Sequence, residues 1–152
     1  MRRLLVPVDF SERSRPQLDY AFALAELTHV EVDVLHVIAG PSTTRAAVDA
    51  FVGRPLPHVS RLDESTAYQQ LGELVDGCHR SGIVPQVLVE AGDVATAIVR
   101  VAAEAPADLV VLSTRGHRGV AELLLGSVAH AVITTAGCPV VTIGEAARRW
   151  TR

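Results

Sequence analysis

The feature that most constrains the fold is a regular alternation between short apolar runs and longer segments with helical periodicity. Each apolar run is rich in Val, Leu or Ile, and a turn-forming Gly or Asp follows it within three residues. This alternation is typical of an α/β fold in which a parallel sheet carries helices on both faces. The predicted strands are 3–8, 31–38, 84–90, 108–113 and 139–143, and the predicted helices are 11–28, 60–80, 94–104 and a last one that ends near 136.

We hypothesise a doubly wound open sheet of five parallel strands in the order 3-2-1-4-5. Right-handed crossovers leave few strand orders possible, and ligands of such sheets bind where the winding direction reverses. In this order the reversal lies between the first and fourth strands, whose carboxyl ends read Pro7-Val8-Asp9 and Ser113-Thr114-Arg115-Gly116. These two turns are the most polar and unusual in the chain. The proposed order brings both into one crevice.

The domain organisation is expected to be simple. We predict one domain over residues 1–146, followed by a polar tail at 147–152. Apolar residues make up 49% of the chain and aromatic residues only 4%, which suits a core of buried parallel strands. Residues 40–59 contain several Pro and Gly residues and no long period, so we expect a long connection with a short helix at 45–51.

Charge and hydropathy argue against several classes of protein. The formal net charge is −3 with both signs mixed along the chain, which does not resemble a basic nucleic-acid surface. Pro7 and Asp9 interrupt the first apolar run, so we expect neither a signal peptide nor a membrane span. Cys78 and Cys138 lie far apart and form no C-x-x-C motif. We therefore expect two reduced thiols in a cytoplasmic protein.

Asp9, directly after the first strand, has two possible uses. Its carboxylate could accept hydrogen bonds from a ribose or hold a hydrated metal ion. It could equally cap the helix that follows, with Phe10 and Ser11 entering that helix. The position of Asp9 supports both uses, and the residues alone do not decide between them.

The stretch STRGHRGVAELLLGS at 113–127 also supports two interpretations. Its glycines, with Ser127, resemble a glycine-rich turn that enters a helix, where free backbone amides bind phosphate. Ser127 could add a hydroxyl or serve as the N-cap. Alternatively, apolar residues recur at helical spacing from 120 to 132. One amphipathic helix would then run through Gly126, at a cost of about 1 kcal/mol relative to Ala.

Several familiar motifs are missing from the chain. The Gly-Ser pair has no Lys before the Ser, as a Walker A loop requires, and the turn after the first strand reads DFSERS rather than a dinucleotide fingerprint. No G-x-S-x-G elbow occurs, and the six histidines do not fall at H-x-x-x-H spacing, which makes a zinc site an unfavoured reading. We interpret His36, within an apolar strand, as a core or rim residue.

Over most of its length, from about Arg2 to Ile143, the chain resembles the universal stress protein family. The first strand, its aspartate and the first helix resemble the opening of that family, and LHVI resembles its second strand. The end of the chain carries two glycines with nine residues between them, Gly116 and Gly126, followed by Ser127. They match the last part of the motif G-2x-G-9x-G-[ST] of the nucleotide-binding branch. At the position of the first glycine of that motif, this chain has Ser113.

The resemblance implies an adenine nucleotide alpha hydrolase-like fold and ATP binding, with Asp9 as the residue that could hold Mg²⁺ or Mn²⁺ through water. It further implies a homodimer formed by antiparallel pairing of the last strands. Its implied ligand contacts are Pro7, Val8 and Asp9 at the adenosine, Val37 against the adenine, and Ser113, Arg115, Gly116, Gly126, Ser127 and Val128 at or near the phosphates; the implied dimer contacts are Pro139, Val140, Val141, Thr142 and Ile143.

The resulting hypothesis is a cytoplasmic, homodimeric, ATP-binding stress protein that acts as a regulatory switch, without nucleic-acid or membrane partners. No convincing general base or nucleophile stands in the loop, so we favour a binding protein over an efficient enzyme. Two alternatives stay open. One is a dimeric interaction protein that binds no nucleotide, which Ser113 slightly favours and which Gly116, Gly126 and Ser127 oppose. The other is a slow ATPase, in which Asp9 polarises water through a metal.

Overall fold

The computed structural model describes residues 1–40, 61–78, 82–114 and 126–144. These residues form a five-stranded sheet in the order β3-β2-β1-β4-β5, with every neighbouring pair parallel. The predicted strand order is therefore confirmed. The elements are β1 (Arg3–Val8), α1 (Ser14–Thr28), β2 (Glu31–Ala39), α3 (Arg61–Asp76), β3 (Gln86–Gly92), α4 (Val94–Glu104), β4 (Leu109–Ser113), α5 (Ser127–Thr135) and β5 (Val140–Ile143).

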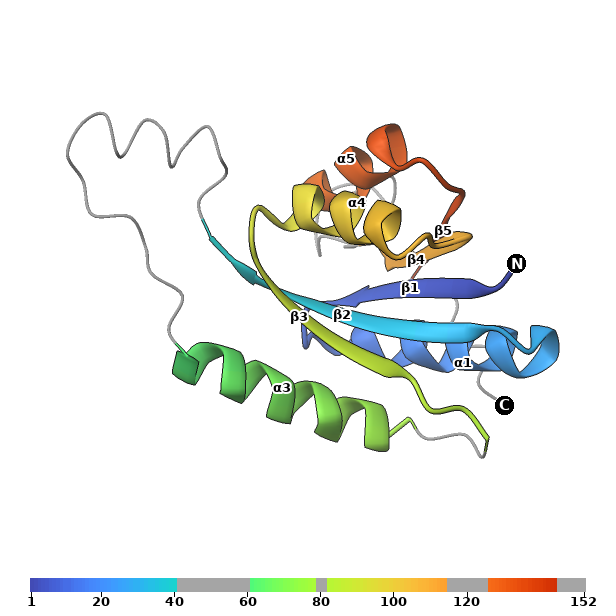
Figure 1. Ribbon diagram of the computed structural model, residues 1–152, viewed down its shortest axis with the longest axis horizontal. Helices are drawn as coiled ribbons and strands as arrows, with labels where there is room; N and C mark the ends of the chain where they lie inside the picture. The colour runs from blue at the N-terminus through green and yellow to red at the C-terminus, as the bar shows by residue number, and fades with distance from the viewer. Residues whose placement is uncertain (41–60, 79–81, 115–125, 145–152) are drawn as a thin grey trace.

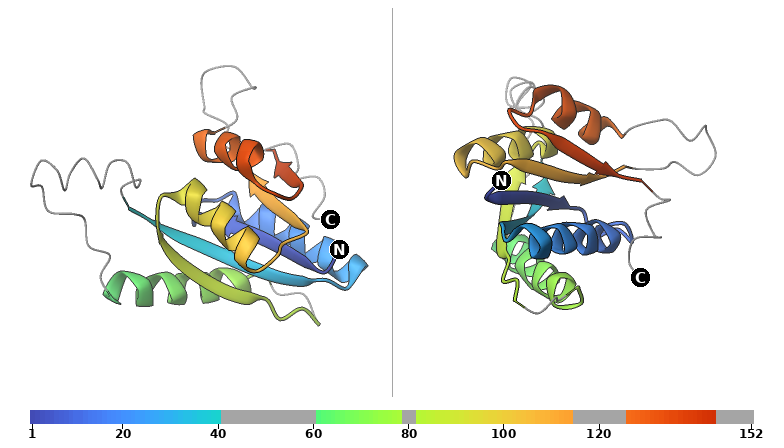
Figure 2. Two further views of the ribbon diagram at one scale, coloured as in Figure 1. Left: turned by 45° about the horizontal axis from the view of Figure 1, so that its top comes forward. Right: turned by 90° about the vertical axis from the view of Figure 1, so that its right-hand side faces the viewer.

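Two layers of helices cover the sheet. Helices α1 and α3 lie against one face, and α4 and α5 lie against the other (Figures 1 and 2). Successive residues of a strand serve opposite faces: Leu4 and Val6 pack with α1 and α3, whereas Leu5 packs with α4 and α5. Because both faces are buried, the strands read as continuous apolar runs rather than as alternating ones.

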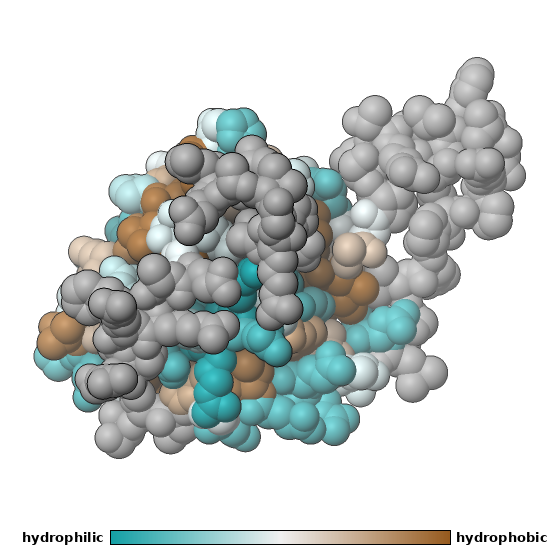
Figure 3. Space-filling model, turned by 180° about the vertical axis from the view of Figure 1, so that it is seen from behind, coloured by the Kyte–Doolittle hydropathy of each residue, from teal (hydrophilic) through white to brown (hydrophobic). Residues whose placement is uncertain are grey.

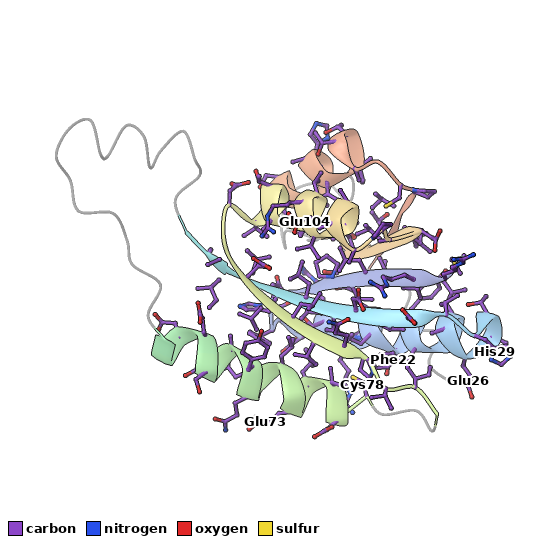
Figure 4. All side chains as sticks on the ribbon, in the orientation of Figure 1. Phe22, Glu26, His29, Glu73, Cys78 and Glu104 are labelled. Carbon is purple, nitrogen blue, oxygen red and sulfur yellow. The ribbon has the colours of Figure 1, made fainter. Side chains whose placement is uncertain are left out.

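The first of the two cores lies between the sheet and the pair α1 and α3. Phe22 and Cys78 are both buried in this core, and Figure 4 shows them in that layer, while Glu73 points outward from α3. On the face shown in the space-filling view of Figure 3, hydrophilic residues lie among hydrophobic ones. No helix in the described part of the chain has the length and apolar character needed to cross a membrane.

The starts of α1 and β3 and the end of α3 differ from the sequence prediction by two residues or more. Helix α1 begins at Ser14 rather than at 11, because Phe10 takes a left-handed conformation with φ of 58° and a turn follows it. Helix α3 ends at Asp76, where the amide of Cys78 bonds back to the carbonyl of Val75 and tightens the last turn. Strand β3 begins after Pro85, which lacks an amide for the ladder. The short helix predicted at 45–51 lies outside the described residues.

Candidate functional site

A pocket of about 440 Å³ opens at the carboxyl ends of the strands. This volume lies within the range of roughly 300–1,000 Å³ that is typical of small-molecule sites. The pocket lies between the ends of β1 and β4, where the winding direction of the chain reverses, which is where ligands of doubly wound sheets bind. The described lining residues are Pro7, Val8, Asp9, His36, Val37, Ile38, Ala39, Val94, Ile98, Leu112, Ser113, Gly126, Ser127, Val128 and Ala129.

The structure brings together the predicted ligand-contact residues that it describes. All of them line this one pocket, although they come from β1, β2, β4 and the start of α5: Pro7, Val8, Asp9, Val37, Ser113, Gly126, Ser127 and Val128. Arg115 and Gly116 lie outside the described residues. The roles of all the predicted contact residues toward a ligand stay predictions.

The crevice exists because β1 and β4 are paired over only part of their length. Their register joins Leu4 to Leu109 and Leu5 to Val110, and no later pair belongs to the recorded ladder between these two strands. By contrast, β1 and β2 are in register from Arg3 to Val8. The carboxyl ends of β1 and β4 therefore separate at the position where the pocket opens.

Asp9 contacts the turn that leads into α1. Its Oδ1 accepts hydrogen bonds from the amide of Ser11 at 3.1 Å and from Oγ of Ser14 at 3.3 Å. The N-cap of α1 is Arg13, so Asp9 orders the preceding turn rather than capping the helix. Asp9 is exposed and lines the pocket. The expected capping of the first helix by Asp9 is therefore wrong, and its role toward a ligand stays a prediction.

Phe10 and His36 join the ends of β1 and β2. Their rings stack with centroids 4.1 Å apart and an interplanar angle of 30°, and Nδ1 of His36 lies 2.9 Å from the carbonyl oxygen of Val8. The positive φ of Phe10 is uncommon for a residue with a side chain. The stack and the contact with Val8 tie the end of β1 to β2, and they agree with the interpretation of His36 as a core or rim residue.

Helix α5 begins inside the pocket. Gly126 is its N-cap, with φ of −59° and ψ of 153°, and the first helical hydrogen bond runs from the amide of His130 to the carbonyl of Gly126. An extended ψ at Gly126 is incompatible with an unbroken helix through this residue, so that interpretation is wrong. Ser127 is the first helical residue and not the N-cap. The amides of the first helical turn have no partners within the helix.

Part of the pocket lining is an apolar wall. This wall consists of Val37 and Ile38 of β2, Val94 and Ile98 of α4, and Leu112 of β4. The N-cap of α4 is Asp93, whose Oδ1 accepts hydrogen bonds from the amide of Thr96 at 3.0 Å and from its Oγ1 at 2.7 Å. These two bonds hold the pKa of Asp93 below its usual value, and the bond from the Thr96 side chain has the larger effect.

Sequence reasoning did not assign seven of the lining residues to the site. The inward face of α4 did identify Ile98 as buried, but its pattern does not say which part of the core that face meets. The residues missed are His36, Ile38, Ala39, Val94, Ile98, Leu112 and Ala129. Within the described ranges no cluster of three or more His, Cys, Asp or Glu side chains could hold a metal ion.

A profile of the universal stress protein family matches residues 1–144 of the 152-residue chain. The chain belongs to this family. Universal stress protein YxiE of Bacillus subtilis is 28% identical over 144 residues, which cover 93% of this chain and 97% of YxiE.

Solved structures of the family share the fold. A universal stress protein from Archaeoglobus fulgidus is 26% identical, with a TM-score of 0.71 over 94% of this chain and 98% of that one. The A. fulgidus universal stress protein has also been solved in complex with dAMP. That structure is 25% identical, with a TM-score of 0.68 over 94% of this chain and 98% of that one. The family's adenine nucleotide alpha hydrolase-like architecture is thus present here.

Proposed function

We propose that this universal stress protein binds an adenine nucleotide, ATP, in the crevice between β1 and β4 and acts as a nucleotide-dependent regulatory switch. The observation that carries the proposal is the composition of one pocket. Its apolar wall suits a base, and the N-terminus of α5 at its other side suits phosphates. The A. fulgidus relative solved with dAMP supports an adenine nucleotide as the ligand.

Each part of the pocket has a role in this proposal. Val37, buried on β2, packs against the adenine, and Pro7, Val8 and Asp9 lie along the adenosine. The amides of Gly126, Ser127 and Val128 at the start of α5 bind phosphate oxygens, because unpaired amides and the helix dipole both favour an anion. Ser113 stands half-buried at the end of β4 beside them. We propose Arg115 and Gly116, which lie outside the described residues, as further phosphate contacts.

Asp9 would hold a metal ion that accompanies the nucleotide. Among the described residues that line the pocket, Asp9 alone carries a carboxylate. Mg²⁺ is commonly held by one or two carboxylates together with substrate phosphates and water. One exposed carboxylate therefore fits Mg²⁺ or Mn²⁺ that arrives with ATP, and it does not fit a metal bound by the protein alone.

Two measurements test nucleotide binding. Mass spectrometry of small molecules released from protein purified without added nucleotide should detect an adenine nucleotide, and millimolar ATP should raise the melting temperature. Asp9→Asn keeps the side-chain shape but removes the charge. It should weaken ATP binding roughly tenfold, the effect of losing one charged hydrogen bond. Asp19→Asn on α1, outside the pocket, is the matched control. A wild-type protein with no shift at millimolar ATP ends the proposal.

The same protein then separates a switch from an enzyme. Single-turnover incubation with labelled ATP and Mg²⁺ or Mn²⁺ measures hydrolysis directly. We expect bound ATP to remain intact over many minutes, as a switch requires. Steady release of phosphate, lost in Asp9→Asn, would instead assign a slow ATPase.

We also propose that the domain spans residues 1–146 and that two copies pair through β5. Strand β5 lies at an edge of the sheet, and an apolar edge strand is a natural pairing surface. The contact would use residues 139–143. Light scattering after size exclusion should give a dimer for the wild type and a monomer for Val141→Lys, while Leu27→Lys, at an exposed position on α1, should stay dimeric. A monomeric wild type contradicts the pairing.

A cytoplasmic location completes the proposal. Cys78 and Cys138 are free thiols, which suits a reducing compartment. Cell fractionation with an antibody against the protein tests this location, and recovery in a membrane or extracellular fraction would contradict it.

A further inference from the structure

Gln17 is a polar side chain buried where α1 crosses the sheet. It is 1% exposed, and its Nε2 donates hydrogen bonds to the carbonyl oxygens of Pro7 on β1 and Val111 on β4, each at 2.7 Å. Because both partners are acceptors, only the amide NH₂ group can face them. Its neighbours Leu18 and Phe22 belong to the apolar core. A polar group in such a place persists only when it is hydrogen-bonded.

The two carbonyl oxygens need a donor because of Pro7. With Leu5 opposite Val110, continuation of the register would set residue 7 opposite Leu112. In a parallel ladder the amide of residue 7 would then donate to the carbonyl of Val111. Proline has no amide hydrogen. The side chain of Gln17 supplies the missing donor from the neighbouring helix, and it bonds the carbonyl of Pro7 with its second hydrogen.

The bridge stands at the place where the site opens. Pro7 and Val8 on one strand, and Leu112 and Ser113 on the other, line the pocket directly beyond the bridged carbonyls. We propose that Gln17 is a positioning residue: its amide holds β1 and β4 at a set separation and thereby fixes the width of the crevice in which nucleotide binds. The part concerning nucleotide rests on the proposed function.

A spectroscopic measurement on the wild-type protein tests the bridge itself. In ¹⁵N-labelled protein, the side-chain NH₂ of Gln17 should exchange with water far more slowly than those of the exposed Gln70 and Gln86. Titration with ATP should shift the Gln17 signals although this residue does not line the pocket. Exchange as fast as that of the exposed glutamines would overturn the inference, and this measurement does not depend on any variant folding.

A pair of variants tests the effect on binding. Gln17→Met keeps the length of the side chain but has no donor. Its Kd for ATP should rise about threefold to thirtyfold, the range seen for residues that act on a site without touching the ligand. Phe22→Leu, in the same helix and core, should lower stability while its Kd stays within twofold of wild type.

Different results would contradict the proposed function and the positioning role of Gln17. A wild-type protein that does not bind ATP contradicts the proposed function. A wild-type protein that binds ATP, together with Gln17→Met that binds it equally well, contradicts the positioning role.

Discussion

Substitution of Gly126 distinguishes a phosphate-binding helix start from a packing helix. Gly126 is the N-cap of α5, with φ of −59° and ψ of 153°, a conformation open to any L-residue. An added side chain therefore does not strain the backbone. It does place new atoms at a position that lines the pocket.

The expected effect on stability follows from the N-cap position. Alanine is a poorer N-cap than glycine, so Gly126→Ala should lower the free energy of unfolding by roughly 0.5–1 kcal/mol. Serine should leave it unchanged or raise it by a few tenths of a kcal/mol, because no side chain caps α5 at present. In the middle of a helix, the alanine substitution would instead stabilise the protein by about 1 kcal/mol.

The effect on binding should be in the same direction for both variants. If the added side chain prevents one amide from reaching a phosphate, about 1.5–3 kcal/mol of binding free energy is lost. This corresponds to a rise in the Kd for ATP of roughly ten- to a hundredfold. Gly126→Ser should thus bind ATP weakly although it is as stable as the wild type.

Urea unfolding and calorimetric titration with ATP measure the two effects. Gly72→Ala is the matched control, because Gly72 lies within α3 and an added Cβ meets no atom within 4 Å. It should stabilise the protein by about 1 kcal/mol and leave the Kd unchanged. If Gly126→Ala stabilises the protein as Gly72→Ala does, the N-cap argument is refuted. If both Gly126 variants keep the wild-type Kd, the phosphate role is refuted.

Three further predictions concern the scaffold. The hydrogen bonds from Thr96 lower the pKa of Asp93, so the stability that they contribute is complete above the unfolded pKa of about 3.9 and is lost as pH falls through the folded value. In urea unfolding between pH 6 and 3, the free energy of unfolding should therefore fall less for Asp93→Asn than for the wild type. An equal fall in the two proteins would contradict this prediction. Leu71→Ala should cost about 2–5 kcal/mol without changing the Kd for ATP, because Leu71 is fully buried away from the pocket. Gly92→Ala should lower the free energy of unfolding by about 1–3 kcal/mol, because φ is 132° at this residue and a side chain is strained there. An unchanged urea unfolding curve would contradict this strain.

The elements of the fold were predictable because their signals are local. A buried parallel strand needs a continuous apolar run, and an outer helix needs one apolar stripe. The residues of each segment therefore indicate whether it is a strand or a helix. The strand order followed from the handedness of the crossovers and from the two polar turns. The boundaries were less predictable. The start of α1 depends on Phe10 stacking on His36, a residue from another strand, and no local pattern contains that contact.

The candidate site was predictable in part for the same reason. Asp9, Ser113 and Gly126 stand at strand or helix ends, where polar and glycine residues are conspicuous. The apolar wall was not predictable as a wall, because Val94 and Ile98 look like any inward face of an amphipathic helix. Whether such a face meets the sheet or a pocket depends on how α4 is placed over β2.

The sequence by itself determined the class of fold, the order of the strands and the end of the sheet at which a ligand would bind. The class of fold follows from periodicity, whereas the strand order and the binding end follow from the handedness of the crossovers and from the two polar turns. The tertiary structure decided that Gly126 is the N-cap of α5 rather than a residue inside a helix. It also decided that Gln17 donates to two strands at once. Hydrogen bonds between residues that are 94 positions apart depend on distances in space, which residue spacing along the chain does not contain.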